Sequence, residues 1–239
     1  MRILALDTAT ENCSAALLIE GRLLAREQLL TRGHAERILP MIDELLREGG
    51  AALAELTAIA FGRGPGAFTG VRLAASVAQG LAFGAGLPVV PVSDLRALAQ
   101  RALERDPAAI RVLVCSDARM HEVYWGCFER AAEGPAVATV LAVAAGDEHV
   151  GPPETVRLPA AWPAPLLTRG VGSGFAAYPE LRSLLAGRVD HFHEGLLPRA
   201  QEIARLAAVE VAAGRAVAAD EALPVYLRED VVHSGGDRH

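Results

Sequence analysis

The stretch "RILALDTATENCSAALLIEGRLLAREQLL", residues 2–30, sets the fold class because it holds three apolar segments separated by short turns. Residues 2–10 alternate and end in small polar residues, residues 13–21 are a second apolar segment, and residues 22–30 follow a turn at Glu20-Gly21. Apolar segments bounded by turn residues are typical of strands joined by hairpins. The stretch therefore predicts three consecutive strands that form a meander.

Helices and strands alternate after this meander. The apolar residues of 34–46 fall on one helical stripe, which Gly49-Gly50 ends. A strand at 56–61, a helix at 68–83, a strand at 87–93 and a helix at 94–104 follow. A meander followed by crossover units is the element order of a ribonuclease-H-like half, and two such halves build the actin and sugar-kinase folds. We therefore predict an α/β protein with an actin-like fold.

The pattern starts again after Asp106-Pro107, where "RVLVCSDAR" and "EVYWGCFER" echo the first two strands. The sequence thus predicts two tandem βββαβα-type halves, of which the second is degenerate. The first domain covers residues 1–106 and the second 107–197, with an irregular Pro-, Ala- and Gly-rich part at 131–165. Residues 198–232 hold a helix (about 198–214), which can pack back on the first domain, and an extended segment. Residues 233–239 are expected to form a loose tail.

Composition and charge exclude some classes of protein. The 239 residues are 51% hydrophobic, which is typical of a globular chain, and the net charge is −6. An acidic chain is a poor stand-alone nucleic-acid binder, because phosphate neutralisation needs a basic patch. The three cysteines have no metal-binding spacing, so we expect buried, reduced thiols. No signal peptide or membrane-spanning run is evident, which favours a cytoplasmic protein.

The glycine-rich segment "GRGPGAFTGVR", residues 62–72, lies between a predicted strand and a predicted helix, where many proteins hold a phosphate. A phosphate-gripping Walker loop needs a lysine, and all 23 basic residues are arginines. The dinucleotide fingerprint also fails, because Ala67 stands where its last glycine belongs. The local pattern therefore favours a tight packing turn over an anion site, and both interpretations stay open.

Asp7, Thr8 and Thr10 follow the first strand and are candidate contacts for a nucleotide phosphate. In actin-like folds an aspartate at this position lies near the metal and phosphate groups. An aspartate at a strand end is more often part of a local turn. One aspartate is a weak signal, so this site is an open prediction.

Metal ligands and catalytic nucleophiles are poorly supported. A helical HxxxH pair starting at His34 would need histidine at Ile38, and the pair His191 and His193 has no evident third ligand. Ser173 lies in a Gly-Ser-Gly sequence, but Val171 stands where the nucleophile elbow requires glycine. We therefore predict no metal site and no catalytic residue.

Several blocks together resemble the TsaB (YeaZ) family, over residues 1 to about 230. They are "ILALDTATENCSAAL", "GHAERILPMIDELL", "AFGRGPGAFTGVRLAASVAQGLAF", "SDARMHEVYWGCF" and "PVYLRE". The GPG-[AS]-FTG-[VL]-R and DAR-x-x-EVY blocks are each specific, and they occur here in the family's order. The chain is identified on these residues as similar to that family.

The resemblance implies a role in making threonylcarbamoyladenosine beside the anticodon of tRNA. It implies a non-catalytic subunit that pairs with the catalytic paralogue TsaD, is joined by the ATPase TsaE, and reaches tRNA only through the complex. It also implies no tightly bound cofactor. Whether the lone protein is a monomer or a homodimer, and whether ATP or ADP binds at the heterodimer junction near Asp7 or Arg72, stay open. The implied interface lies on the helices 34–46 and 68–83, at His34, Ile38, Leu39, Ile42, Phe68, Val71, Arg72 and Ala75.

Two rival functions remain. The first is a stand-alone actin-fold ATPase or transferase, which Asp7, Thr8 and Thr10 would serve. The second is a protease acting on a partner through Ser173. The same apolar helix faces can also be the chain's own core, because burial inside a chain and burial against a partner give the same sequence pattern.

Overall fold

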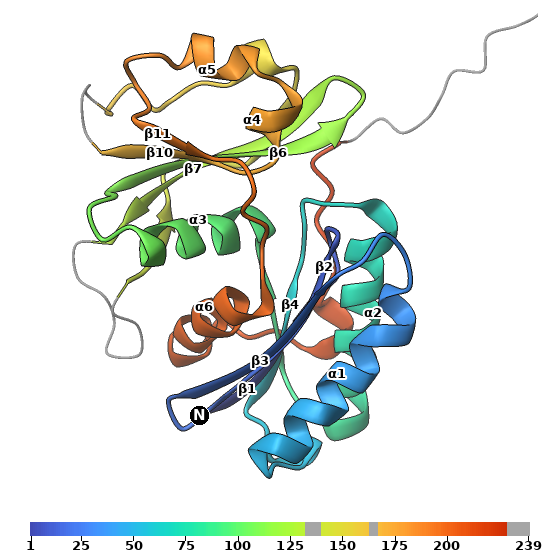
Figure 1. Cartoon of the computed structure of the whole chain (residues 1–239). Helices are drawn as coiled ribbons and strands as arrows, with labels where there is room; N and C mark the ends of the chain where they lie inside the picture. The colour runs from blue at the N-terminus through green and yellow to red at the C-terminus, as the bar shows by residue number, and fades with distance from the viewer. Residues whose placement is uncertain (132–139, 163–166, 229–239) are drawn as a thin grey trace, which may run out of the picture.

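A five-stranded sheet forms the base of the first lobe (Figure 1). The computed structural model describes residues 1–131, 140–162 and 167–228. Strands β1 (Arg2–Asp7), β2 (Asn12–Ile19) and β3 (Arg22–Leu29) form an antiparallel meander, and β4 (Ala58–Gly62) and β5 (Val89–Val92) extend it in parallel. The strand order β3-β2-β1-β4-β5 confirms the ribonuclease-H-like topology predicted for the first half.

Helices cover both faces of this sheet. Helices α1 (His34–Gly49) and α2 (Phe68–Ala85) pack on one face and α6 (Ala200–Ala212) on the other. Successive residues of a strand point to opposite faces. In β1, Leu4 and Leu6 therefore pack with α1 and α2, whereas Ile3 and Ala5 pack with α6.

The second lobe is built on a six-stranded sheet. Strands β6 (Arg111–Arg119) and β7 (Glu122–Arg130) form its central hairpin, as the sequence predicts. The short strands β8 (Ala142–Ala144) and β9 (His149–Gly151) pair with β7, and β10 (Thr168–Val171) and β11 (His191–His193) continue from β6. Helices α4 (Gly174–Ala177) and α5 (Glu180–Leu184) cover the outer face.

Helix α3 (Asp94–Arg105) covers the inner face of the second sheet. Its residues Leu95, Leu98 and Leu103 pack with strands of that sheet. The prediction placed residues 1–106 in the first domain, but by packing the second lobe already begins at α3. Element order shows where a helix lies in the chain, but it does not show which of two sheets the helix buries its apolar side against.

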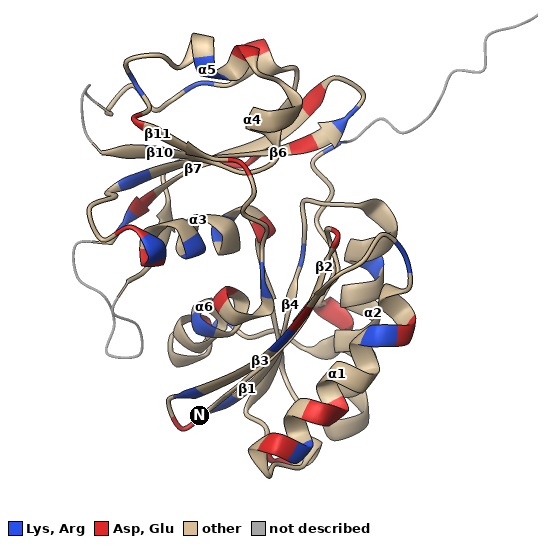
Figure 2. Cartoon of the chain, viewed as in Figure 1, with Lys and Arg blue, Asp and Glu red and all other residues tan. Residues whose placement is uncertain are grey.

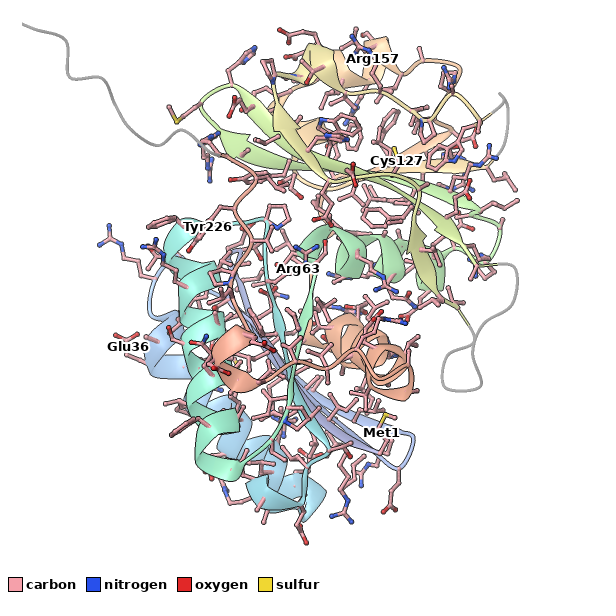
Figure 3. The ribbon with its side chains drawn as sticks, turned by 180° about the vertical axis from the view of Figure 1, so that it is seen from behind. Met1, Glu36, Arg63, Cys127, Arg157 and Tyr226 are labelled. Atoms are coloured by element: carbon pink, nitrogen blue, oxygen red, sulfur yellow. The ribbon has the colours of Figure 1, made fainter. Side chains whose placement is uncertain are left out.

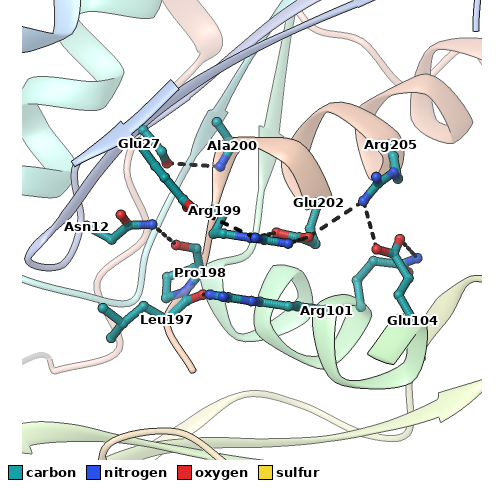
Figure 4. A network of polar contacts seen from close by, with 12 residues as sticks. Asn12, Glu27, Arg101, Glu104, Leu197, Pro198, Arg199, Ala200, Glu202 and Arg205 are labelled. Carbon is teal, nitrogen blue, oxygen red and sulfur yellow. Dashed lines mark hydrogen bonds and ion pairs between the residues drawn. The ribbon is translucent and has the colours of Figure 1, made fainter. Parts of the chain in front are cut away.

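A buried charge network joins α3 and α6 between the lobes (Figure 4). Glu202 is fully buried, and Arg199 donates to both of its carboxylate oxygens, at 3.0 and 2.6 Å. Arg205 lies 3.6 Å from Glu202 and 2.7 Å from Glu104 of α3. Arg101 of α3 donates to the carbonyl of Leu197 at 2.6 Å. A buried carboxylate needs such partners, because an isolated charge in the interior is costly.

Residues 222–228 run in an extended conformation from the first lobe to the second and are called the strap below. The strap binds the first lobe where the N–H of Val225 donates to the carbonyl of Arg63 at 2.8 Å. It binds the second lobe where Arg228 pairs with Glu122 and donates to the carbonyl of Ala118 at 3.3 Å. The predicted tail at 233–239 lies outside the described residues.

The three cysteines are free and buried, as predicted. Burial raises the pKa of Cys13 to about 11 and that of Cys127 to about 12, and it raises the pKa of Cys115 well above its usual value. The thiolate is the reactive form of cysteine. These thiols are therefore inert in the folded chain.

Candidate functional site

The glycine-rich loop and the first turn of α2 lie directly on the turn between β1 and β2. The N–H of Ala67 donates to the carbonyl of Ala9 at 2.8 Å, and the hydroxyl of Thr8 donates to the carbonyl of Gly70 at 2.6 Å. A Cβ on Gly66 would lie 2.7 Å from the carbonyl oxygen of Ala9, and a Cβ on Gly70 would overlap that of Thr8. These glycines let two backbones touch, so the loop is a packing turn.

Two carboxyl groups meet beneath this loop. Asp7 ends β1 and Asp94 begins α3, and both are almost completely buried. Both carboxyl groups converge on Gly62, where a Cβ would lie 2.8 Å from Asp7 Oδ1 and overlap Asp94 Oδ1. Glycine at position 62 therefore makes the space for the pair.

Each carboxyl group of the pair also holds a piece of backbone. Asp7 Oδ1 accepts the N–H of Ala9 at 2.8 Å. Asp94 Oδ2 accepts the N–H of Gly64 at 2.5 Å, and the Asp94 N–H donates to the Gly64 carbonyl at 3.0 Å. Burial raises the pKa of Asp7 to about 7, and burial together with the charge of Asp7 raises the pKa of Asp94 well above its usual value.

Asp7 and Thr8, the candidate contacts for a nucleotide, are both buried, and their polar atoms bind the β1–β2 turn and α2. Thr10 is half-buried, and His34 Nε2 lies 2.9 Å from its carbonyl oxygen. This arrangement leaves no exposed carboxylate oxygen of Asp7 and no exposed hydroxyl of Thr8 for a phosphate to contact.

Four of the predicted interface residues are also corrected. Ile38, Ile42, Val71 and Ala75 are at most 3% exposed, so they do not reach the surface; all but Val71 lie in the core between the sheet, α1 and α2. Their apolar pattern reflects the chain's own interior. The amphipathic stripe of each helix shows which side is apolar, but it does not show what covers that side.

The other predicted interface residues reach the surface. Leu39 of α1 is 49% exposed and Phe68 of α2 is 52% exposed. Arg72 is exposed and is the only charged residue of α2, so the outer side of this helix has little charge (Figure 2). His34 is half-buried at the start of α1. We call the outer side of these two helices the α1–α2 face, which also includes Phe83 at 84% exposure.

The strap completes the α1–α2 face at its upper end. Tyr226 lies beside α2 in Figure 3, and its ring centroid is 5.6 Å from that of Phe68. Arg72 lies over the Phe68 ring at 3.6 Å and donates through Nε to the Tyr226 hydroxyl at 2.7 Å. Tyr226 lies more than 150 residues along the chain from Arg72. The sequence pattern therefore does not show that it belongs to this cluster.

The second lobe carries its own aspartate at the corresponding strand end. The Asp117 carboxylate accepts the Tyr178 hydroxyl at 3.1 Å and the N–H of Arg119 at 2.8 Å. The hydroxyl of Ser173 accepts the N–H of Asp117 at 3.0 Å. In the described part of the chain no histidine is hydrogen-bonded to Ser173.

A cavity of about 620 Å³ lies between the lobes. Arg63 stands at its edge (Figure 3), donates to Glu148 at 3.3 Å, and has Arg96 as a neighbour in the lining. Arg96 in turn pairs with Glu210 at 2.7 Å. Four charges of the lining, those of Arg63, Glu148, Arg96 and Glu210, are thus paired within the chain.

The described residues contain no group of three His, Cys, Asp or Glu side chains that could hold a metal ion. His191 and His193 are both exposed on β11, and Phe192 between them packs inward. None of the helices in the described ranges is long and apolar enough to cross a membrane.

Comparison with known proteins gives one consistent result. The family model described as TsaD, tRNA N6-adenosine threonylcarbamoyltransferase, matches residues 28–224. The tRNA threonylcarbamoyladenosine biosynthesis protein TsaB of Escherichia coli is 42% identical, covering 97% of this chain and 96% of the relative; that of Haemophilus influenzae is 39% identical, covering 97% and 95%. The structure of YeaZ from Pseudomonas aeruginosa superposes with a TM-score of 0.84 at 47% identity, over 95% of this chain and 99% of that one.

Proposed function

Because this chain belongs to the TsaB (YeaZ) family of tRNA threonylcarbamoyladenosine biosynthesis proteins, we propose that it acts in that tRNA modification as a non-catalytic partner of a TsaD-like catalytic subunit. The partner would dock on the α1–α2 face. The protein would work in the cytoplasm, and tRNA would be reached through the complex.

The observation that carries this proposal is the exposed apolar character of the α1–α2 face. Leu39, Phe68 and Phe83 are each about half exposed or more, and α2 presents a single charge. Exposed apolar surface with little charge is a feature of protein interaction sites. The Phe68, Arg72 and Tyr226 cluster adds the residue types that are enriched at the centres of interfaces.

The packing of the glycine-rich loop onto the β1–β2 turn supports a partner role over the rival ATPase. An actin-fold ATPase would use the aspartate at the end of the first strand near the phosphates, but Asp7 is fully buried beneath the glycine-rich loop. Pairing with a TsaE-like ATPase, a homodimer of the lone protein, and ATP or ADP at the heterodimer junction stay predictions from the family resemblance.

The test is binding of this chain to the TsaD-like protein of the same organism, measured by size-exclusion chromatography with light scattering. We expect Phe68→Asp to lower the affinity at least about tenfold, because a charge would be buried in an apolar contact. The matched control is Leu184→Asp, which places the same charge on a leucine that is 55% exposed on α5 of the second lobe. Equal affinities of the two variants would refute the docking face.

A second readout tests the pathway itself. Cells depleted of this protein and complemented with each variant are assayed for threonylcarbamoyladenosine in total tRNA by mass spectrometry. We expect the modification to fall with Phe68→Asp and to stay at the wild-type level with Leu184→Asp. Normal modification in cells that lack the protein altogether would refute the proposed function.

A further inference from the structure

We propose that Asp7 and Asp94 share a proton at neutral pH, and that this proton latches the glycine-rich loop and the start of α2 onto the β1–β2 turn. The pair is thus a protonation site beneath the loop that leads into α2, one of the two helices of the α1–α2 face. The proposal does not depend on which partner binds that face.

The two carboxyl groups meet beneath the glycine-rich loop. They come from the ends of different elements and converge on the position that a Cβ on Gly62 would occupy. Asp7 Oδ2 and Asp94 Oδ1 are buried and have no N–H or O–H donor from another residue. If both carboxylates were ionised, these two oxygens would have no hydrogen-bond donor and the two negative charges would repel each other. One proton between the groups supplies a donor and removes one of the charges.

The pair also holds the backbone of the glycine-rich loop and of the β1–β2 turn by hydrogen bonds. Asp94 accepts the N–H of Gly64 and donates its own N–H to the Gly64 carbonyl, so it fixes the loop from both sides. Asp7 accepts the N–H of Ala9, whose carbonyl receives the N–H of Ala67 just before α2. The protonated pair and these hydrogen bonds therefore connect α3, the end of β1 and the start of α2.

Two titratable side chains, Glu148 and Cys13, act on the pair or lie near it. Glu148, which lies between β8 and β9, raises the pKa of Asp94 further, although Glu148 itself is bonded to Ser93 and paired with Arg63. On the side of β2, the Cys13 thiol faces Asp7 and has a pKa of about 11, so it stays neutral.

No guanidinium forms an ion pair with either aspartate in the described residues. Arg37 of α1 acts electrostatically on Cys13 and not on the pair. His34 contacts the carbonyl of Thr10 in the adjoining turn. The charge neighbouring the pair is therefore negative, which favours retention of the proton.

The sign of the pH dependence follows from the raised pKa values. A carboxyl group titrates near pH 4 in the unfolded chain, so the unfolded chain loses these protons while the folded chain keeps them. The stabilisation is complete below about pH 4 and is lost as the pH rises through about 7, the pKa of Asp7. The pair then holds the one shared proton, and the loop loosens only when that proton leaves as well.

The experiment compares wild type with Asp94→Asn in urea unfolding between pH 5 and pH 8. The amide oxygen of the new asparagine can accept the N–H of Gly64 and its NH₂ group can donate to Asp7, so the variant mimics a proton that never leaves. Between pH 5 and pH 7 we expect the unfolding constant of wild type to rise by about a further tenfold per pH unit relative to the variant, because one more proton is released on unfolding. Asp43→Asn, at an exposed position of α1, is the matched control and should follow wild type.

Two further measurements complete the test. Carbon-13 NMR of the wild-type carboxyl groups should show the first ionisation of the pair near pH 7. Hydrogen exchange at Gly64 and Ala67 should accelerate more in wild type than in Asp94→Asn once the second proton has left. Parallel unfolding curves for wild type and Asp94→Asn, or two carboxyl groups titrating near pH 4, would overturn the proposal. So would a stability that depends on added Mg²⁺ and not on pH, since the pair would then hold a cation.

Discussion

The two lobes each carry a hairpin with an aspartate at or near the end of its first strand, and they stabilise the turn that follows in different ways. In the first lobe Asp7 is fully buried, and the start of α2 lies on the turn of residues 8–11. In the second lobe the Asp117 side chain keeps 15% exposure and accepts the Tyr178 hydroxyl, and the Asp117 N–H donates to the Ser173 hydroxyl.

The backbone of the two turns differs as well. None of the described residues 8–11 has a positive φ, whereas Arg119, Met120 and His121 have φ values of 63°, 55° and 59°. Three consecutive non-glycine residues in the left-handed region are strained. The first turn is thus fixed by a backbone segment packed directly onto it, and the second by side-chain hydrogen bonds that hold a strained backbone. Adding a side chain to the packed segment should therefore disturb the first turn more than removing one side-chain contact disturbs the second.

The largest effect is expected from Gly70→Ala, because the new methyl group would overlap the carbonyl of Thr8. Forcing α2 off the turn should lower the free energy of unfolding by about 3 kcal/mol, measured by urea denaturation. Gly80→Ala in the same helix is the matched control. Its Cβ would meet nothing within 4 Å, so alanine should stabilise the helix by about 1 kcal/mol. Equal effects of the two variants would show that the first turn is not sealed by packing.

A smaller effect of opposite sign is expected from Met120→Gly. Glycine adopts a positive φ without steric cost, and the Met120 side chain is 71% exposed, so stability should rise by about 1 kcal/mol. Val143→Gly, at an exposed strand position without positive φ, should instead lower stability. A loss of stability in Met120→Gly would mean that the turn is not strained.

Tyr178→Phe should have a weaker effect, because the lost hydrogen bond to Asp117 lies at a half-exposed site. We expect a loss of about 0.5 kcal/mol in urea denaturation. Thermal unfolding monitored in the same variant should move by a few degrees at most. A loss as large as that of Gly70→Ala would contradict the view that the second turn depends on several small side-chain contacts.

The smallest effect is expected from Arg119→Ala. The Arg119 side chain is 87% exposed, and its ion pair with Asp117 at 3.0 Å is screened by solvent. The change in the free energy of unfolding should be about 0.2 kcal/mol and should vanish in high salt. A larger, salt-resistant loss would give the guanidinium a structural role in the turn.

Much of the fold could be predicted from the sequence, because alternation and amphipathic periodicity are local. The meander, the helices that became α1 and α2, and the hairpin of residues 111–130 are all present. The predicted site was less accurate. Asp7 was expected to be accessible, and only the contact of Ala9 with Ala67, which lies far along the chain, shows that it is not.

Ile42 and Val71 show a second limit of sequence reasoning. Each lies on the apolar stripe of its helix, and the stripe fits a core and an interface equally well. Asp94 could have been found: it directly follows a strand parallel to β1, and the carboxyl ends of parallel strands meet at one edge of a sheet. Two aspartates at that edge would have predicted the pair.

Helix α6 covers one face of the first sheet although it follows the whole second lobe in the sequence. During synthesis, strands β1 to β5 therefore leave the ribosome with half of their apolar surface bare, and they stay so until more than 100 further residues have been made. At about 5–20 residues per second this interval lasts several seconds. The second lobe can form in that time, so the first lobe to be synthesised is the last to be completed.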